Sequence, residues 1–187
     1  GVGGEGEDVE GRGHGQGARE PDERLSARGD SRAASGAPEY RPTTPALASP
    51  FSMTVRPATP ADLAPLAALF DAYRQFYRTP ADRDAARAFL AERLDADDSV
   101  LLVAEGGGGP TGFTQLYPLF SSVRMRRVWL LNDLYVAPDA RRQGVARALM
   151  EAAHAHAVST GAAAVQLATE HTNGAGQALY ESLGYAR

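Results

Sequence analysis

Large apolar residues are rare in the first 52 positions of the chain and are dense and regularly spaced from Met53 onward. Residues 1–52 have six large apolar side chains but hold 10 of the 20 glycines and five of the 12 prolines. So few apolar groups cannot offset the roughly 1–2 kcal/mol per residue that ordering a backbone costs. We therefore expect residues 1–52 to be a disordered extension, either without function or acting as an interaction tail, and residues 53–187 to form the folded domain.

Two helices are predicted at the start of the folded part. The tetrapeptide Thr-Pro-Ala-Asp occurs at residues 59–62 and again at residues 79–82. Each copy supplies an N-cap hydroxyl, a proline at the first helical position and an acid in the first turn. Apolar residues at helical spacing follow each copy. They are Leu66, Leu69, Phe70, Tyr73 and Tyr77 in the first helix, and Ala86, Phe89, Leu90 and Leu94 in the second.

The other predicted elements are strands and helices in alternation. A short strand at residues 54–56 precedes the two helices, and residues 118–127 are expected to be a loop between two later strands. The resulting order, β-α-α-β-β-β-α-β-α, predicts an α/β protein with a mixed sheet and helices on both faces. The later strands are expected at 100–104, 112–117, 128–136 and 164–169, and the later helices at 142–159 and 174–183.

Charge and composition narrow the classes of function. The chain has 19 basic and 23 acidic side chains, a formal net charge of -4, which argues against a strongly basic nucleic-acid binder and against a polybasic membrane anchor. The absence of cysteine excludes disulfides, thiolate metal sites and a cysteine nucleophile, and we expect no metal. No segment approaches the roughly 18 apolar residues that span a bilayer, and the N-terminus lacks the layout of a secretory signal. We therefore expect a soluble, cytoplasmic protein with neither nucleic-acid nor membrane partners.

The strongest chemical signal is the junction between one buried strand and the helix that follows it. Residues 134–138 read Leu-Tyr-Val-Ala-Pro, and residues 141–146 read Arg-Arg-Gln-Gly-Val-Ala. The free N–H groups of the first helical turn, with the positive end of the helix dipole behind them, form an anion site that suits a diphosphate. Gly144 permits close approach of the phosphates. Positive charge around this site comes from Arg141, Arg142 and Arg147.

This junction resembles the acetyl-CoA site of the Gcn5-related N-acetyltransferases, whose signature is Arg/Gln-x-x-Gly-x-Gly/Ala after such a strand. Arg141, Gly144 and Ala146 match that signature. A second block, residues 173–185, is similar to the family's Asn-x-x-Ala-x-x-Leu-Tyr-Glu helix and its Gly-aromatic ending. The two blocks together are specific for this family. The resemblance covers residues 53–187.

The resemblance implies the acyl-CoA N-acyltransferase fold and transfer of an acetyl group from acetyl-CoA to a primary amine by direct attack. It also implies that Asn173 contacts the pantetheine arm and that the Tyr180 hydroxyl is the general acid that protonates the departing thiolate. The family's β-bulge would place a backbone N–H near Val136 against the thioester carbonyl. By the same resemblance, acetyl-CoA is bound by Leu134, Val136, Arg141, Arg142, Gln143, Gly144, Val145, Ala146, Arg147 and Asn173.

Three positions depart from the family pattern. Gly176 stands where the family usually has Ala, which is a small helix penalty of about 1 kcal/mol. Asn132 stands where the resembling polyamine acetyltransferases carry a Glu that acts as base, and an Asn cannot take up a proton. The chain ends at Arg187, where the family continues into one or two more strands, so we expect the C-terminal strands of the sheet to be missing. Two acids are candidate bases. Glu170, at the end of its strand, is the better placed. Strand alternation puts Asp133 on the opposite face from Asn132, where a structural role is favoured over a role as base.

Two functions are consistent with these residues. The first is an acetyl-CoA-dependent N-acetyltransferase. The second is a catalytically silent acyl-CoA-binding or regulatory domain. The missing Glu at Asn132 argues for the silent domain, and the presence of Tyr180 argues against it. A nucleotide-binding α/β domain is excluded because neither a Gly-x-Gly-x-x-Gly nor a Walker loop is present. The strand around Asp133 and residues 112–117 most resemble the polyamine- and histone-type members of the family, which implies a flexible cationic amine or a lysine-containing peptide as acceptor. Whether the chain forms a homodimer is left open.

Overall fold

The computed structural model describes residues 23–28 and 53–186, and for residues 23–28 it describes the backbone path alone. Within these residues, α-helices and two short 3₁₀ helices (η) cover one sheet. No described helix is both long and apolar enough to cross a membrane. The strands are β1 (Glu23–Arg28), β2 (Thr54–Pro57), β3 (Val100–Gly106), β4 (Gly109–Ser121), β5 (Arg126–Val136) and β6 (Ala164–Thr169). The helices are η1 (Pro60–Asp62), α1 (Leu63–Phe76), α2 (Arg83–Ala96), η2 (Pro138–Ala140), α3 (Val145–Ser159) and α4 (Gly174–Ser182).

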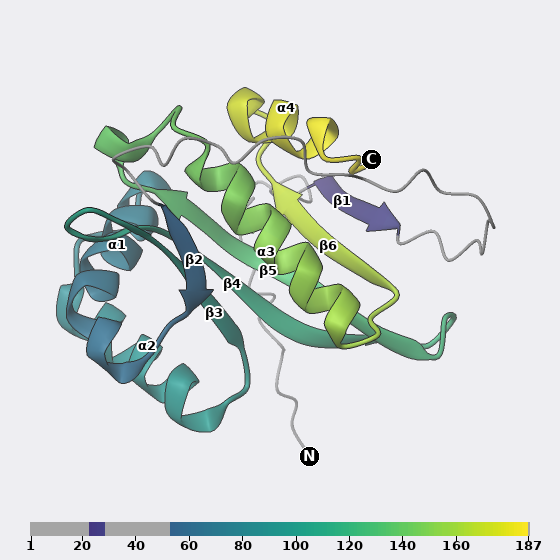
Figure 1. Cartoon of the computed structure of the whole chain (residues 1–187), viewed down its shortest axis with the longest axis horizontal. Coiled ribbons are helices and arrows are strands. Elements are labelled where there is room, and N and C mark those ends of the chain that lie inside the picture. The colour runs from purple at the N-terminus through teal and green to yellow at the C-terminus, as the bar shows by residue number, and fades with distance from the viewer. Residues whose placement is uncertain (1–22, 29–52, 187) are drawn as a thin grey trace, which may run out of the picture.

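The sheet has the strand order β1-β6-β5-β4-β3-β2 (Figure 1). Neighbouring strands are antiparallel except for β5 and β6, which run parallel and are connected through α3. Strands β2 to β6 and the four α-helices follow one another in the order that the apolar pattern predicts. The predicted α/β mixed sheet with helices on both faces is therefore confirmed.

One strand comes from the N-terminal segment. β1 pairs antiparallel along β6, from Glu23 opposite Thr169 to Arg28 opposite Ala164, and it lies at the edge of the sheet (Figure 1). These six residues depart from the disorder that we expect of residues 1–52. The rest of that segment, 1–22 and 29–52, lies outside the described residues, so the division of the chain at residue 52 stays a prediction.

The core lies on both faces of the sheet because alternate residues of the central strands point to opposite sides. β3 shows this directly, since Leu101 and Val103 face one helical layer while Leu102 and Ala104 face the other. α1 and α2 cover the first face, and α3 covers the second (Figure 1). The buried helix residues on the first face are Leu66, Phe70, Ala86 and Leu90, and those on the second include Leu149, Met150, Ala153 and Ala157.

The hairpin between β4 and β5 is longer than predicted. Residues 118–127 are not a loop, because β4 continues to Ser121 and β5 begins at Arg126. Pro118 is tolerated inside β4 because β3 begins to pair only at Val100, opposite Leu116. Beyond Leu116 the edge of β4 that faces β3 has no neighbour among the described strands, so the missing N–H of proline breaks no ladder hydrogen bond.

The two Thr-Pro-Ala-Asp tetrapeptides start helices in different ways. At the second copy the N-cap is Asp82, not Thr79, because the Asp82 carboxylate accepts a hydrogen bond from the Ala85 N–H at 2.9 Å. The Asp82 N–H in turn donates to the Asp71 carboxylate at 2.8 Å. At the first copy Thr59 precedes η1, and the helix α1 begins only after it.

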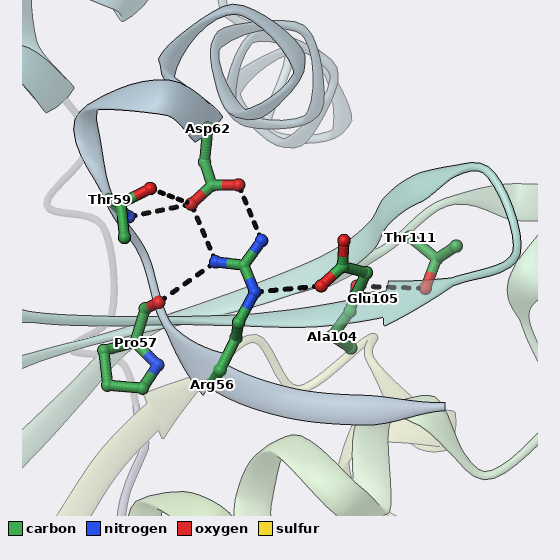
Figure 2. A network of polar contacts seen from close by, with 7 residues as sticks. All are labelled: Arg56, Pro57, Thr59, Asp62, Ala104, Glu105 and Thr111. Atoms are coloured by element: carbon green, nitrogen blue, oxygen red, sulfur yellow. Dashed lines mark hydrogen bonds and ion pairs between the residues drawn. The ribbon is translucent and has the colours of Figure 1, made fainter. Parts of the chain in front are cut away.

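The first tetrapeptide belongs to a group of paired polar side chains that we call the Arg56 cluster: Arg56, Thr59, Asp62 and Glu105 (Figure 2). The Arg56 guanidinium donates two hydrogen bonds to the Asp62 carboxylate, at 2.8 and 2.9 Å, and a third to Glu105 at 2.9 Å. The N–H and hydroxyl of Thr59 both donate to Asp62 at 2.8 Å. The cluster thereby ties β2, η1 and β3 together at the start of the domain.

Candidate active site

β5 and β6 begin as neighbours and then separate. Their parallel pairing is confined to Trp129 opposite Val165 and Leu130 opposite Gln166. Beyond Leu130, β5 keeps β4 on one side but pairs with no described strand on the other. A cavity of about 590 Å³ opens there, with walls from α1, β5, the start of α3, the end of β6 and α4.

Two backbone N–H groups of β5 point into this cavity. The Ala137 N–H donates to the Thr111 carbonyl at 2.9 Å, on the β4 side, and backbone groups alternate sides along an antiparallel strand. The N–H groups of Leu134 and Val136 therefore point away from β4, toward the gap. The Val136 carbonyl points the same way, since it accepts a hydrogen bond from the Arg141 Nε at 3.0 Å. Both N–H groups can donate to an oxygen that develops negative charge in the cavity.

The β-bulge of β5 lies at Asn132. Gln115 of β4 is opposite Asp133, whereas the next residue, Leu116, is opposite Leu131, so Asn132 is the extra residue. The bulge lies earlier in the strand than the position near Val136 that the family resemblance implies. It also brings the Asn132 Nδ2 within 3.1 Å of the Asp133 Oδ1, so the expectation that these side chains occupy opposite faces is wrong.

The turn before α3 presents unpaired backbone donors. Arg142 and Gly144 adopt left-handed conformations, with φ of 62° and 85°, so α3 begins at Val145 and not at residue 142. The first helical hydrogen bond runs from the Ala148 N–H to the Gly144 carbonyl at 3.0 Å, which leaves the preceding N–H groups without a partner within the helix. A Cβ added at Gly144 would meet nothing within 4 Å, so this side of the turn is open to a ligand.

Arginine side chains surround that turn. The Arg141 guanidinium lies 5.6 Å from the centre of the Tyr135 ring, while its Nε holds the Val136 carbonyl. Arg147 donates to the Ser182 hydroxyl at 2.8 Å, which links α3 to α4. Together with the free N–H groups and the helix dipole, these cations can attract an anion such as a diphosphate.

α4 supplies the opposite wall. Asn173 is its N-cap, and the Asn173 Oδ1 accepts a hydrogen bond from the Gly176 N–H at 3.1 Å while its Nδ2 donates to Thr169 at 3.0 Å. A Cβ at Gly176 would lie 2.5 Å from the Asn173 Nδ2, so an alanine here would make the Asn173 side chain shift. Gly176 therefore accommodates the Asn173 cap in the geometry that the structure shows.

Comparison with known proteins identifies the family. Residues 66–185 match the model of the Acetyltransferase (GNAT) family. The chain belongs to the GNAT family of acetyltransferases. It is 48% identical over 133 residues to the uncharacterized N-acetyltransferase YhfO of Bacillus subtilis (strain 168), covering 71% of this chain and 89% of that relative. It is 30% identical over 120 residues to the D-amino-acid N-acetyltransferase HPA3 of Saccharomyces cerevisiae (strain ATCC 204508 / S288c), covering 63% of this chain and 74% of that protein.

Solved structures agree with this assignment. The crystal structure of a probable acetyltransferase superposes with a TM-score of 0.69 at 40% sequence identity, covering 72% of this chain and 90% of the other. The chain is accordingly a GNAT N-acetyltransferase, and acetyl-CoA is the co-substrate that the family implies. The comparisons do not single out the polyamine- or histone-type members.

The residues expected to bind acetyl-CoA come together in the cavity, with one exception. Gln143 does not line it, because its side chain turns back and donates to the Asp139 carbonyl at 2.9 Å, which closes the turn before α3. The others that line the cavity are Leu134, Val136, Arg141, Arg142, Gly144, Val145, Ala146, Arg147 and Asn173. In the part of the chain that the structure describes, no three His, Asp or Glu side chains are grouped to hold a metal ion.

Tyr180 also lines the cavity of this GNAT domain. Only 7% of the residue is exposed, and burial, together with the nearby Tyr77, raises the pKa of its hydroxyl to about 12. A phenol with this pKa stays protonated at neutral pH, so it can act as a proton donor.

The two candidate bases lie differently. Glu170 does not line the cavity, and its carboxylate accepts a hydrogen bond from the Thr172 hydroxyl at 3.2 Å. Asp133 is 5% exposed and lies behind the cavity wall. Burial raises the pKa of Asp133, while hydrogen bonds from Asn132 and Tyr73 act in the opposite direction.

One wall of the site is not apparent from the sequence pattern. The helical spacing places Tyr73 and Tyr77 on the same face of the helix as Leu66 and Phe70, but it does not indicate that they line a cavity with Phe76 and Tyr135. Phe76 is 56% exposed, so it is not core. A signal is nevertheless present, because residues 70–77 contain four aromatic residues, more than one buried helix face accommodates.

Proposed function

We propose that this cavity binds acetyl-CoA and that the protein transfers the acetyl group directly to a primary amine. The observation that carries the proposal is that Gly144, Val136 and Tyr180, from three different elements, line one cavity. The diphosphate is bound by the N–H groups and arginines at the start of α3. The pantetheine arm lies along the unpaired side of β5, near Asn173, and the thioester lies between β5 and Tyr180.

The proposed reaction needs a neutral amine, an oxyanion donor and an acid. The amine nitrogen attacks the thioester carbon while an N–H of β5, from Val136 or Leu134, stabilises the charge on the carbonyl oxygen. The C–N bond forms, the C–S bond breaks, and the Tyr180 hydroxyl protonates the departing sulfur. The proton that the amine loses leaves through water, and the tyrosinate regains a proton from the same source. Attack is direct because the chain has no cysteine to carry an acetyl group.

The acceptor class is the open part of this proposal. The likeness to polyamine- and histone-type enzymes favours a flexible cationic amine or a lysine-containing peptide. The relative HPA3 is named as a D-amino-acid N-acetyltransferase, which adds amino acids as a second class of primary amine. Glu170 stays a proposed base, although its position outside the cavity wall gives it no direct route to an amine.

Calorimetry with acetyl-CoA, combined with a thiol-release assay on a panel of amines, tests the proposal. We expect binding of one acetyl-CoA per chain and thiol release that depends on an added amine. Binding without amine-dependent release would instead support the catalytically silent domain. Absence of binding would contradict both functions.

A further inference from the structure

Aromatic side chains from the end of α1 form one wall of the cavity. We infer that the acceptor is a primary amine that has no second cationic group and that carries an aromatic or bulky apolar group, which packs against Tyr73, Phe76 and Tyr77. This inference rests on the proposed function, since it names the substrate class of the same site. The three residues, here called the ring wall, all come from the C-terminal end of α1.

The rings hold one another in position. The Tyr73 and Tyr77 ring centres are 5.2 Å apart and meet edge to face, and the Phe76 and Tyr77 rings do the same at 5.2 Å. Tyr73 also contacts Tyr135 of β5, with centres 6.2 Å apart. A wall fixed in this way can bind a flat or bulky apolar group without losing side-chain freedom.

The ring wall is more exposed than apolar side chains of a folded domain need to be. Phe76 is 56% exposed and Tyr77 39%, yet both line the cavity. Covering such surface with an apolar part of the acceptor is favourable. A small or wholly polar amine would leave that surface exposed to water and would gain no binding free energy from it.

Charge limits the acceptor to one ammonium group. No Asp or Glu is among the described residues that line the cavity, and its charged lining residues are Arg141, Arg142 and Arg147. The Tyr73 hydroxyl donates to the Asn132 carbonyl at 3.4 Å, so it too offers a cation no carboxylate. The further ammonium groups of a polyamine or a lysine-rich peptide would therefore find no anionic partner among the described residues that line the cavity.

Three amines separate these possibilities with the full chain and acetyl-CoA. Phenethylamine has one ammonium and a ring, ethylamine has the ammonium alone, and spermidine has several ammonium groups. With thiol release as the readout, we expect phenethylamine to give a kcat/KM about tenfold or more above that of either other amine, as burial of one aromatic ring allows. A lysine-containing peptide is assayed beside them and should behave like spermidine.

The ring wall is tested with Phe76→Ala. Because Phe76 is largely exposed, the variant should fold, and its preference for phenethylamine over ethylamine should fall by about tenfold through a higher KM, with little change in kcat. Phe120→Ala is the matched control, since Phe120 is 74% exposed at the hairpin end and does not line the cavity. It should leave the preference unchanged.

The outcomes are distinguishable. Turnover of spermidine or the peptide that equals or exceeds that of phenethylamine would overturn the inference and leave the proposed function intact. An unchanged preference in Phe76→Ala would likewise overturn the role of the ring wall. Binding of acetyl-CoA without thiol release for any of these amines would overturn the proposed function, and the inference with it.

Discussion

Two aspartates of this protein are almost equally buried and have opposite electrostatic surroundings. Asp62, in the Arg56 cluster, is 6% exposed, and Asp133, behind the cavity, is 5% exposed. The Arg56 guanidinium holds the pKa of the Asp62 carboxyl well below its usual range, and Thr59 adds to this effect. The partners of Asp133 are neutral, so burial dominates and raises its pKa.

The Arg56 cluster and the cavity differ in how many of their polar groups have a partner within the protein. In the Arg56 cluster the guanidinium is bonded to both carboxylates, and these contacts join three elements, as a structural group does. The cavity presents strand N–H groups and the N-terminus of a helix, and Arg142 there makes no hydrogen bond or ion pair with any described residue. We therefore expect substitutions in the first region to change stability and substitutions in the second to change binding or rate.

The largest effect is expected for Tyr180→Phe, which removes only the hydroxyl. If this group protonates the thiolate, kcat should fall by roughly 10²–10⁴, the usual contribution of a positioned acid, while acetyl-CoA affinity and thermal stability hardly change. Tyr185→Phe is the matched control, because Tyr185 is also buried but bonds His154 at 2.8 Å and does not line the cavity. Near-native turnover of Tyr180→Phe would remove the hydroxyl from the mechanism.

Gly144→Glu should weaken acetyl-CoA binding by about 100-fold or more, since it puts a carboxylate where phosphates approach the N–H groups of α3. Gly161→Glu controls for backbone strain, because Gly161 has a similar φ of 64° and equally open surroundings at the other end of α3. Gly144→Ala, which adds only the strain of a side chain at positive φ, should have a milder effect. Calorimetry measures all three, and equal losses in the two Glu variants would show that the phosphates bind elsewhere.

Asp62→Asn should destabilise the domain by about 1–3 kcal/mol with no change in kcat, because it removes a charge-assisted hydrogen-bond acceptor far from the chemistry. The lowered pKa of Asp62 means that its contribution is present above about pH 4, near the unfolded pKa, and is lost as pH falls further. Urea unfolding at pH 7 and near pH 3 should show the gap between wild type and variant narrowing in acid. A constant gap would contradict the ion-pair origin.

Asp133→Asn should show the opposite sign. A carboxyl with a raised folded pKa contributes stability below about pH 4 that is lost as pH rises through the folded value. Relative to wild type, the variant should therefore become more stable between pH 4 and pH 7, measured by urea unfolding. A relative loss over that range would mean that Asp133 has a cationic partner.

The smallest effect is expected from deletion of residues 1–52. We propose that residues 53–187 carry the activity, because the cavity is lined by residues from Tyr73 to Tyr180. Acetyl-CoA affinity should change by less than about twofold, and the thermal midpoint should fall by only the few degrees that one edge strand contributes. A large drop in affinity would show that β1 holds β6, and with it the cavity, in position.

Apolar periodicity predicts most of the fold because each element of residues 53–186 has its own buried face. β3 is buried on both sides and appears as an unbroken apolar run, and α1 and α3 show helical spacing. β1 is not predictable in this way, since it joins through backbone pairing with β6 and not through an apolar pattern. The sequence places the start of α3 too early because Arg142, a non-glycine residue, adopts a left-handed turn that no local signal reveals.

The acetyl-CoA side of the site is predictable from the sequence and the acceptor side is not. Gly144 and Asn173 act through local backbone geometry, so their motifs carry the information. The bulge at Asn132 depends on the register between two strands, and the cavity that Tyr73, Phe76 and Tyr77 line opens where β5 and β6 separate. Both are non-local properties, so helical spacing alone does not reveal that these aromatic residues line a site.

The separation of β5 and β6 also has a consequence for stability. A ligand that completes the unpaired side of β5 binds the folded chain and not the unfolded one, and under the proposed function that ligand is acetyl-CoA. At a concentration about 100 times its dissociation constant, such a ligand adds about 2.7 kcal/mol to the free energy of unfolding. The thermal midpoint of the chain should then rise with the concentration of acetyl-CoA.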